Sequence, residues 1–199
     1  MIEEYDLILA DRLGVIRAAY QKFDLENKSY ISFSGGKDSL IVSKLFDMAI
    51  PGNKIPRLFI DTGIEYLAIK KFVFALQKND PRISILRPAG SIKSILETYG
   101  YPFKSKEHSA KLHEWQKGHK NQKSLKKYLT EKGKFSCPDI LRYQFEDSFK
   151  LKVSPACCKK MKKQPAKKWA RENLRPIAIT GIRKEEGGEP PKPPGMLGL

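Results

Sequence analysis

Short runs of apolar and β-branched residues alternate with helical patterns along this 199-residue chain. Four runs are expected to be strands: residues 30–33, 57–60, 83–86 and 177–180. Helical patterns follow the first three runs, over residues 38–46, from 64 to 78, and between Ser91 and Gly100. Strands that alternate with helices pair in parallel, because each helix carries the chain back to the same edge of the sheet. The chain is therefore predicted to form a parallel, three-layer α/β sheet.

An amphipathic helix is predicted before the first strand. Its apolar residues recur at intervals of three or four: Ile2, Tyr5, Leu9, Leu13, Ile16, Tyr20 and Phe23. At the other end, the segment GGEPPKPPGMLGL from Gly187 onward is expected to be a flexible tail without regular structure. We therefore expect an N-terminal helix over residues 1–27, a domain over 28–186 and a tail over 187–199.

The second half of the chain is predicted to be helical and basic. Residues 104–134 are polar and helical in pattern. The pair Ser154-Pro155 suits the cap and first turn of a helix that carries Cys157 and Cys158. Pro165 is expected to open a further helix that runs to Leu174.

The net charge of +16 is unevenly distributed. Residues 1–103 contain 14 Lys/Arg and 12 Asp/Glu, whereas residues 104–199 contain 24 and 10. This asymmetry indicates either an anionic partner or a solvated lysine-rich surface. Lysines near Trp115 and Trp169 would suit the phosphates and bases of tRNA or DNA, although both tryptophans could equally be packing residues.

The sequence predicts a cytoplasmic protein without a membrane partner. No apolar run approaches the roughly 18 residues of a membrane-spanning helix. The start MIEEYDLILADR is acidic and lacks the pattern of a signal peptide. Whether the chain forms a homo-oligomer is left open.

The segment Ser34-Gly35-Gly36-Lys37-Asp38-Ser39 lies between the first predicted strand and the helix after it. A glycine-rich turn at a helix start exposes N–H groups where the helix dipole also favours anions, so this loop can hold phosphates. The spacing is neither that of a Walker A loop nor that of the G-x-G-x-x-G fingerprint. Tight strand-to-helix turns also use glycines for purely structural reasons.

This hexapeptide resembles the PP-loop of the adenine nucleotide α-hydrolase-like superfamily. The wider chain resembles the phosphoadenosine phosphosulfate (PAPS) reductase family of that superfamily over residues 28–188. The resemblance is carried by the SGGKDS loop, the D-T-G segment at Asp61–Gly63, the pair Cys157-Cys158 before a lysine-rich helix, and the segment Gly181-Ile182-Arg183. It implies a doubly wound parallel sheet that binds ATP, adenylyl sulfate (APS) or PAPS at the carboxyl ends of its strands.

The resemblance implies roles for residues in three segments. The nucleotide-binding set is Ser32, Ser34, Gly35, Gly36, Lys37, Asp38, Ser39, Asp61, Thr62, Gly63, Gly181 and Arg183. Within it, Lys37 would neutralise charge on the leaving group, and Asp38 would orient Lys37 or help to place Mg²⁺. Asp38 could instead be a helix-start carboxylate, Asp61 a turn residue and Arg183 a surface arginine.

Cys157 and Cys158 are the candidate redox or cluster residues. Sulfonucleotide reductases of the family use a nucleophilic cysteine, and some hold a [4Fe–4S] cluster with four thiolates. This chain contains three cysteines, so a cluster is not expected from it alone, and the pair could be partial ligands or simply buried thiols. No metal site is predicted at His108, His113 and His119, whose spacing does not place them on one helical face; these histidines are expected to face solvent or phosphate.

Three functions are compatible with these patterns. The first is a PAPS reductase-family enzyme of sulfur metabolism or sulfur transfer that acts at the anhydride next to the α-phosphate. The retained Lys37 and Asp38 resemble family members that cleave ATP between the α- and β-phosphates. The second is an ATP pyrophosphatase that thiolates tRNA or DNA bound by the basic half, and the third is a nucleotide-binding module without catalysis.

Overall fold

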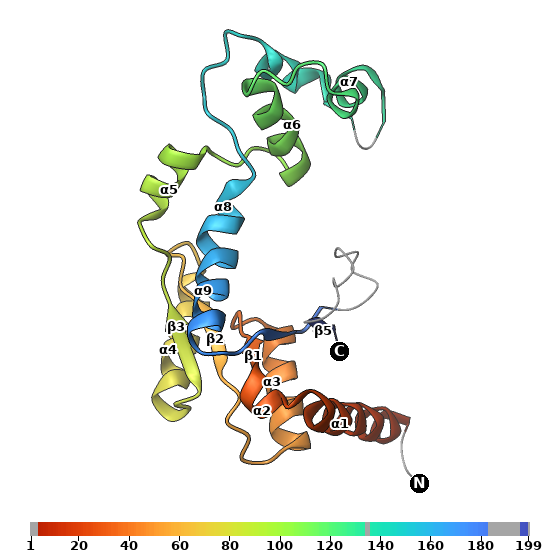
Figure 1. Cartoon of the computed structure of the whole chain (residues 1–199), viewed down its shortest axis with the longest axis vertical. Coiled ribbons are helices and arrows are strands. Elements are labelled where there is room, and N and C mark those ends of the chain that lie inside the picture. The colour runs from red at the N-terminus through yellow and green to blue at the C-terminus, as the bar shows by residue number, and fades with distance from the viewer. Residues whose placement is uncertain (1–3, 134–135, 183–195, 199) are drawn as a thin grey trace. The chain divides into compact units, whose positions relative to one another are not determined.

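The computed structural model describes residues 4–133, 136–182 and 196–198 of the chain (Figure 1). The chain divides into two compact units. Residues 1–87 and 165–199 form one unit, which we call the sheet unit, and residues 88–164 form the other, which we call the helical unit. None of the helices within the described ranges is both long and apolar enough to cross a membrane.

The sheet unit is built on a parallel sheet. Its strands are β1 (Ser29–Ser32), β2 (Arg57–Ile60), β3 (Ile83–Leu86), β4 (Ile177–Thr180) and β5 (Met196–Gly198). They lie in the order β3-β2-β1-β4-β5, and every adjacent pair is parallel. The chain thus moves outward from β1 to β3 and then continues on the other side of β1. This confirms the predicted doubly wound α/β fold.

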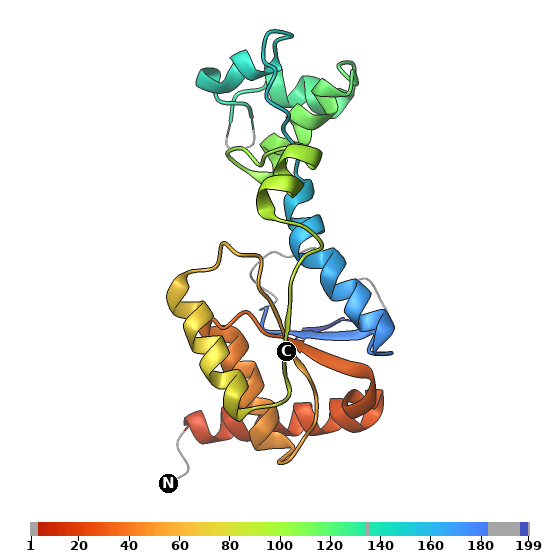
Figure 2. The ribbon, with the colours of Figure 1, turned by 90° about the vertical axis from the view of Figure 1, so that its left-hand side faces the viewer.

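Three helices cover one face of this sheet: α1 (Glu4–Phe23), α3 (Lys37–Ala49) and α4 (Leu67–Asn79) (Figure 2). Side chains alternate between the two faces along a strand, so Ile31 and Phe33 point to the same side. Ile31 packs with α1 and α3 in a cluster that consists of Ile16, Leu25, Ile31, Val42, Phe46, Ala49, Ile55 and Ile179. Phe33 packs with Phe59, Val73 and Ile83 beneath α4. These two clusters form the core of the sheet unit.

The opposite face of the sheet contacts α9 (Gln164–Glu172). Tyr30, which alternates with Ile31 and is buried, meets the Trp169 ring edge-on with centroids 5.6 Å apart. Trp169 is therefore a packing residue of the sheet unit. Pro165, expected to open this helix, is instead its second residue, because α9 follows directly on the π-helical turn η2 (Lys159–Lys163).

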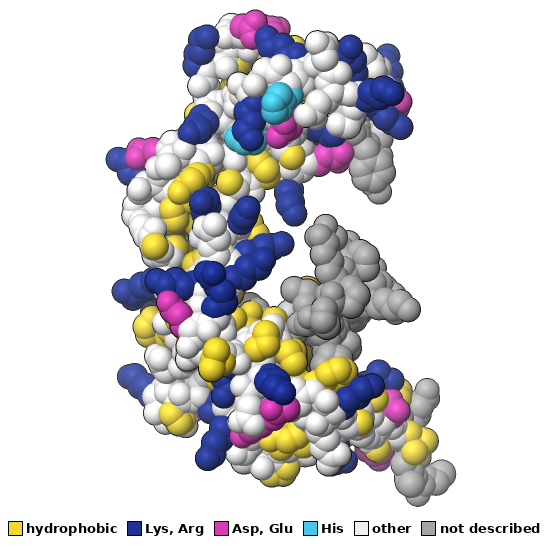
Figure 3. Space-filling view, in the orientation of Figure 1, with side chains coloured by type: hydrophobic (Ala, Val, Ile, Leu, Met, Phe, Trp, Pro, Cys, Tyr) yellow, Lys and Arg dark blue, Asp and Glu magenta, His cyan; other side chains and the backbone are white. Residues whose placement is uncertain are grey.

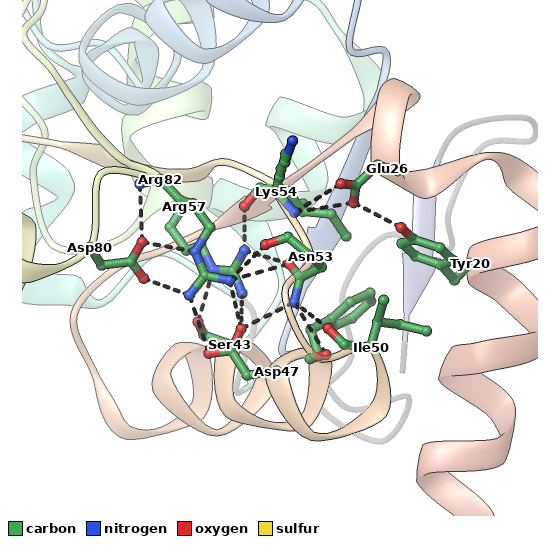
Figure 4. Close-up of polar contacts among 12 residues, drawn as sticks. Tyr20, Glu26, Ser43, Asp47, Ile50, Asn53, Lys54, Arg57, Asp80 and Arg82 are labelled. Carbon is green, nitrogen blue, oxygen red and sulfur yellow. Dashed lines mark hydrogen bonds and ion pairs between the residues drawn. The ribbon is translucent and has the colours of Figure 1, made fainter.

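A buried arginine joins the amino ends of β2 and β3 to the end of α3 (Figure 4). Arg57 is 1% exposed and donates to Ser43 Oγ at 3.1 Å, to Asn53 Oδ1 at 2.8 Å and to Asp47 Oδ1 at 2.7 Å. Arg82 pairs with the same Asp47 oxygen at 2.7 Å and with Asp80 at 2.7 Å. We call these residues the arginine network. It gives each buried charge a partner of opposite sign, as a buried ion requires.

The helical unit contains α5 (Ile92–Tyr99), α6 (Lys106–Gln116), α7 (Lys123–Thr130), the 3₁₀ helix η1 (Asp139–Phe145), α8 (Ala156–Cys158) and η2. A separate core joins α6, α7 and η1, and it is made of Leu112, Leu125, Tyr128, Cys137, Phe145 and Val153. A parallel bridge between Tyr101 and Val153 ties the two ends of the unit to each other. The helix that carries the paired cysteines begins as predicted near Ser154, whose Oγ accepts from the Ala156 N–H at 3.0 Å.

His108 lies inside this core, which contradicts the expectation that it faces solvent or phosphate. Its Nδ1 is 2.8 Å from Tyr128 Oη, and its Nε2 is 2.8 Å from Gln144 Oε1. Burial lowers the pKa of His108, although the Gln144 hydrogen bond opposes that shift. The prediction was wrong because the residues next to His108 in the sequence are polar. The Tyr and the Gln that bind its two ring nitrogens lie elsewhere in the chain.

The last part of the chain also differs from expectation. Met196–Gly198 form β5 and pair in parallel with β4, so the prediction of no regular structure after Gly187 is wrong for these three residues. Backbone pairing with a neighbouring strand does not need the apolar pattern that the segment lacks. Residues 187–195 lie outside the described residues. The predicted boundaries at 27 and 186 stay a prediction.

Candidate functional site

The PP-loop segment Ser34–Ser39 turns from the end of β1 into the first turn of α3. Ser34 and Ser39 hold the turn together, because the Ser34 N–H donates to Ser39 Oγ at 3.2 Å and the two hydroxyls are 3.1 Å apart. The Ser39 hydroxyl also donates to the Gly36 carbonyl at 2.9 Å, and Ser39 is buried. The Gly36 N–H donates to Ser34 Oγ at 3.3 Å, so the two serine hydroxyls shape the loop. The N–H groups of the first turn of α3 remain available for a ligand.

Gly35 is required by both conformation and packing. Its φ is +75°, and a Cβ atom there would lie 2.6 Å from Val73 Cγ2 and 2.9 Å from Ile69 Cγ2 on α4. No side chain fits this position without moving α4. Gly35 thus lets the loop lie flat against the helix after β2.

Gly181 brings the end of β4 to the same loop. A Cβ atom on Gly181 would lie 3.1 Å from the Asp38 carbonyl oxygen and 3.1 Å from Val42 Cγ2. Two segments about 140 residues apart in the sequence therefore meet at the start of α3. β1 and β4 are neighbours at which the strand order reverses, and ligands of doubly wound sheets bind at the carboxyl ends of such strands.

The charged residues of the loop have no ion-pair partner among the residues that the structure describes. Lys37 and Asp38 are exposed at the start of α3, and no ion pair within the described ranges includes either side chain. The first turn of α3 also leaves its N–H groups without partners in the helix, next to the positive end of the helix dipole. Ser32, the last residue of β1, is exposed beside them. The loop therefore presents one exposed cation, Lys37, together with the N–H donors of the first turn of α3.

The D-T-G segment follows β2, the neighbour of β1. Asp61 is buried and pairs with Lys70 Nζ at 3.0 Å and with Arg87 Nε at 3.5 Å. Burial alone would raise the pKa of Asp61, but the hydrogen bond and charge of Lys70, with smaller contributions from the Gly63 N–H and Arg87, lower it below its usual value. Asp61 is thus an anion that holds two cations at the carboxyl edge of the sheet.

Glu65 organises this segment and was not predicted as a site residue. Its carboxylate accepts from the Thr62 N–H at 2.9 Å, from the Thr62 hydroxyl at 2.6 Å and from the Gly63 N–H at 3.1 Å. The T-x-x-E spacing of Thr62 and Glu65 is the sequence signal that could have indicated this role. Lys70 and Arg87 carried no such signal, because their partner Asp61 lies in another element.

The paired cysteines belong to the helical unit, whereas the loop belongs to the sheet unit. Cys157 is half-buried and Cys158 exposed at the start of the lysine-rich turn. Cys137 packs in the core of the helical unit, where burial raises the pKa of its thiol. Across the described ranges, no three Cys, His, Asp or Glu side chains gather as a metal site. The three thiols therefore do not form a set that fits a [4Fe–4S] cluster. Arg183 lies outside the described residues.

A family model for the phosphoadenosine phosphosulfate reductase domain matches residues 28–136, which is more than half of the chain. The chain belongs to the PAPS reductase domain family. The match contains the PP-loop and the D-T-G segment of this family. Cys157, Cys158, Gly181 and Arg183 lie beyond the matched range, and the roles expected for them stay predictions. A comparison with curated proteins gave no match.

Proposed function

We propose that the sheet unit binds the anionic end of an adenine nucleotide in the PP-loop and acts at the anhydride next to the α-phosphate. The observation that carries this proposal is the meeting of the loop, the α3 N-terminus and Gly181 at the point where the strand order reverses. The nucleotide is ATP, APS or PAPS, since the loop's donors suit a terminal pyrophosphate and a terminal sulfate alike. Membership of the PAPS reductase domain family supports an adenine nucleotide.

The loop residues would divide the work between binding and charge neutralisation. N–H groups of Gly35 and the first turn of α3 would donate to the terminal oxygens. Lys37 would neutralise the negative charge that develops on the leaving group, because its side chain is exposed and has no carboxylate partner among the described residues. Ser34 and Ser39 would keep the loop in the shape that presents these donors.

The second loop would hold the nucleotide's other anionic groups. Lys70 and Arg87 are oriented by Asp61, and the Arg87 side chain is 73% exposed, so its guanidinium can contact a phosphate while Nε stays near the carboxylate. Thr62 and Gly63 would shape this loop, since the Thr62 hydroxyl and the N–H groups of both residues donate to Glu65.

Asp38 is the residue that would support a Mg²⁺ ion. It is exposed at the start of α3 beside the proposed phosphate position. Mg²⁺ sites on nucleotides commonly use one or two carboxylates together with phosphate oxygens, so a single Asp fits this arrangement. When bound, the ion would neutralise charge on the phosphates.

Titration of the purified chain with ATP, APS and PAPS by calorimetry tests the proposal, with Lys37→Ala as the comparison. Preference for ATP that is weakened in the variant supports an adenylating pyrophosphatase, and release of pyrophosphate with candidate acceptors is then the assay. Preference for a sulfonucleotide supports a reductase role for Cys157 and Cys158, which Cys158→Ser would abolish. Binding without turnover of any nucleotide supports a module without catalysis. The absence of binding to all three nucleotides would contradict the proposal.

A further inference from the structure

A pocket of about 390 Å³ lies entirely within the helical unit, between the end of α6 and the segment after η1. Its volume is within the usual range for sites that take a small molecule or one unit of a polymer. The lining residues are Trp115, Gln116, Gly118, Lys120, Glu146, Asp147, Phe149, Lys150 and Lys152. Two aromatic side chains thus share a pocket with three lysines.

Trp115 packs against the core of the helical unit and also lines the pocket. The indole ring is half-buried and meets the Phe145 ring edge-on, with centroids 5.9 Å apart. This contact fixes the orientation of the indole. Lys120 Nζ lies over the ring, 4.7 Å from the centroid, and pairs with Asp147 at 2.6 Å. Lys120 is thus the group that covers this indole face, and a planar ligand that stacks on the ring would take its place.

Hydrogen bonds from Gln116 anchor the backbone of another part of the pocket lining. Gln116 accepts from the Val153 N–H at 3.0 Å and donates to the Leu151 carbonyl at 2.7 Å. These bonds hold the segment that carries Lys150 and Lys152 against α6. Both lysines are exposed. Lys150 can reach an anion at the pocket mouth, and Lys152 can do so by exchanging the hydrogen bond that it donates to the Thr98 carbonyl.

The charge of the helical unit favours a polyanion over a single small anion. Residues 88–164 contain 18 Lys/Arg and 7 Asp/Glu, a net charge of +11. Figure 3 shows Lys and Arg side chains over α6 and α7 and over the region of α8. Lys159, Lys160, Lys162 and Lys163 have no carboxylate within ion-pair distance in the described part of the chain. Such a field attracts an extended phosphate backbone.

We propose that the Trp115 pocket stacks one base of a single-stranded nucleic acid, with Lys150 and Lys152 on the adjacent phosphates. A single strand is favoured over a duplex because only an unpaired base can leave its neighbours and enter a pocket. The surrounding charge favours a strand over a free nucleotide. The site lies within one unit and uses none of the PP-loop residues, so it does not depend on the proposed function.

Binding of fluorescently labelled 20-nucleotide oligo(dT) and oligo(U), measured by anisotropy, tests this proposal, with a duplex of equal length beside them. Trp115→Ala should bind the strands roughly 5- to 150-fold more weakly, as expected when one stacked base is lost. Trp115→Phe should retain most of the affinity, since it keeps an aromatic face. Strand binding should also quench tryptophan fluorescence in the wild type but not in Trp115→Phe. Unchanged circular dichroism would show that the variants are folded.

The lysines are tested through the salt dependence of the same binding. The double variant Lys150→Ala/Lys152→Ala should show a weaker salt dependence. The slope of the logarithm of the binding constant against the logarithm of the salt concentration should decrease by about 0.7 for each lost phosphate contact. Lys93→Ala removes one charge from α5, outside the pocket, and should leave the slope of pocket binding unchanged. Asp147→Asn should strengthen binding, because it frees Lys120 and removes an anion from the pocket.

Three results would overturn the proposal: equal strand binding by wild type and Trp115→Ala, preference for the duplex, or no oligonucleotide binding. Binding of free AMP in the pocket without strand binding would also overturn it, in favour of a small-molecule site. Lys37→Ala should bind strands normally and Trp115→Ala should bind ATP normally. Failure of one proposal is therefore distinguishable from failure of the other.

Discussion

Charged residues gather at both edges of the sheet, and the two groups differ in one decisive respect. At the amino end, Arg57 and its partners satisfy one another within the protein (Figure 4). At the carboxyl edge, the charges of Lys37 and Asp38 have no such partners among the described residues. The first cluster stabilises the fold, and the second is available to a ligand. A high density of charged residues therefore does not by itself identify a binding site. Charged side chains without a protein partner are the better indication.

The largest expected effect comes from breaking the arginine network. Arg57→Ala leaves Asp47 half-buried with fewer partners and opens space beneath β2, so we expect a loss of about 3–5 kcal/mol in the free energy of unfolding. Urea denaturation measures it. Lys44→Ala, which removes an exposed cation from the same helix, should change that free energy by less than about 0.5 kcal/mol. A similar loss of unfolding free energy in both variants would contradict the structural role of the arginine network.

Two glycines with the same backbone conformation sharpen the comparison. Gly35 at the carboxyl edge and Gly52 at the amino edge have φ of +75° and +78°, but space around Gly52 is open. Gly52→Ala should cost about 1–2 kcal/mol for the left-handed conformation alone. Gly35→Ala should cost a further 1–3 kcal/mol or so, because its Cβ meets α4. Thermal and urea unfolding would measure the difference, and equal losses would refute tight loop packing.

Lys37→Ala should affect binding without affecting stability, the reverse of Arg57→Ala. An exposed lysine contributes little to folding, so the free energy of unfolding should change by less than about 0.5 kcal/mol. Loss of a charged hydrogen bond to phosphate should weaken nucleotide binding roughly 10- to 150-fold. Lys44→Ala is again the matched control in calorimetry. A destabilised Lys37 variant would place this residue with the structural cluster instead.

The smallest effect is the pH dependence of the arginine network. Burial opposes ionisation of Asp47, but Arg82 and Arg57 outweigh it and lower the pKa of this carboxyl; Arg82 also lowers the pKa of Asp80. A carboxyl with a lowered folded-state pKa stabilises above its unfolded pKa of about 3.9, and that stability disappears as the pH falls through the folded value. The stability difference between wild type and Asp47→Asn should therefore be constant near pH 6 and shrink below about pH 4. Urea midpoints at several pH values measure it, and a difference that grows in acid would contradict it.

The sequence predicted the sheet well because its strands are short apolar runs bounded by glycine, proline and polar residues. The runs at 57–60, 83–86 and 177–180 coincide with β2, β3 and β4. The PP-loop was equally visible, since six consecutive residues carry its chemistry. Local patterns of this kind depend only on neighbours in the chain.

Residues that act through distant partners could not be predicted in this way. Arg57 reads as a charge in a strand, and its burial depends on Asp47, Asn53 and Ser43 coming together in space. His108 was misjudged for the same reason. β5 was missed because its pairing with β4 comes from the backbone. Contacts between residues far apart in the chain are therefore the part of the fold that could not be predicted from the sequence.

The close approach of Gly181 to Asp38 has a consequence for how the protein is made. The central strand β1 can pair with its neighbour β4 only after β4 has been synthesised, and β4 follows the entire helical unit in the chain. At typical rates of synthesis, roughly 7–30 s separate the emergence of the PP-loop from that of the strand beside it. During that interval one edge of β1 has no neighbour, and Arg175 is not yet present to donate to the carbonyls of Glu26 and Ser29. The carboxyl edge of β1 is thus completed only after the helical unit has been made, so a growing chain cannot form the proposed nucleotide site before then.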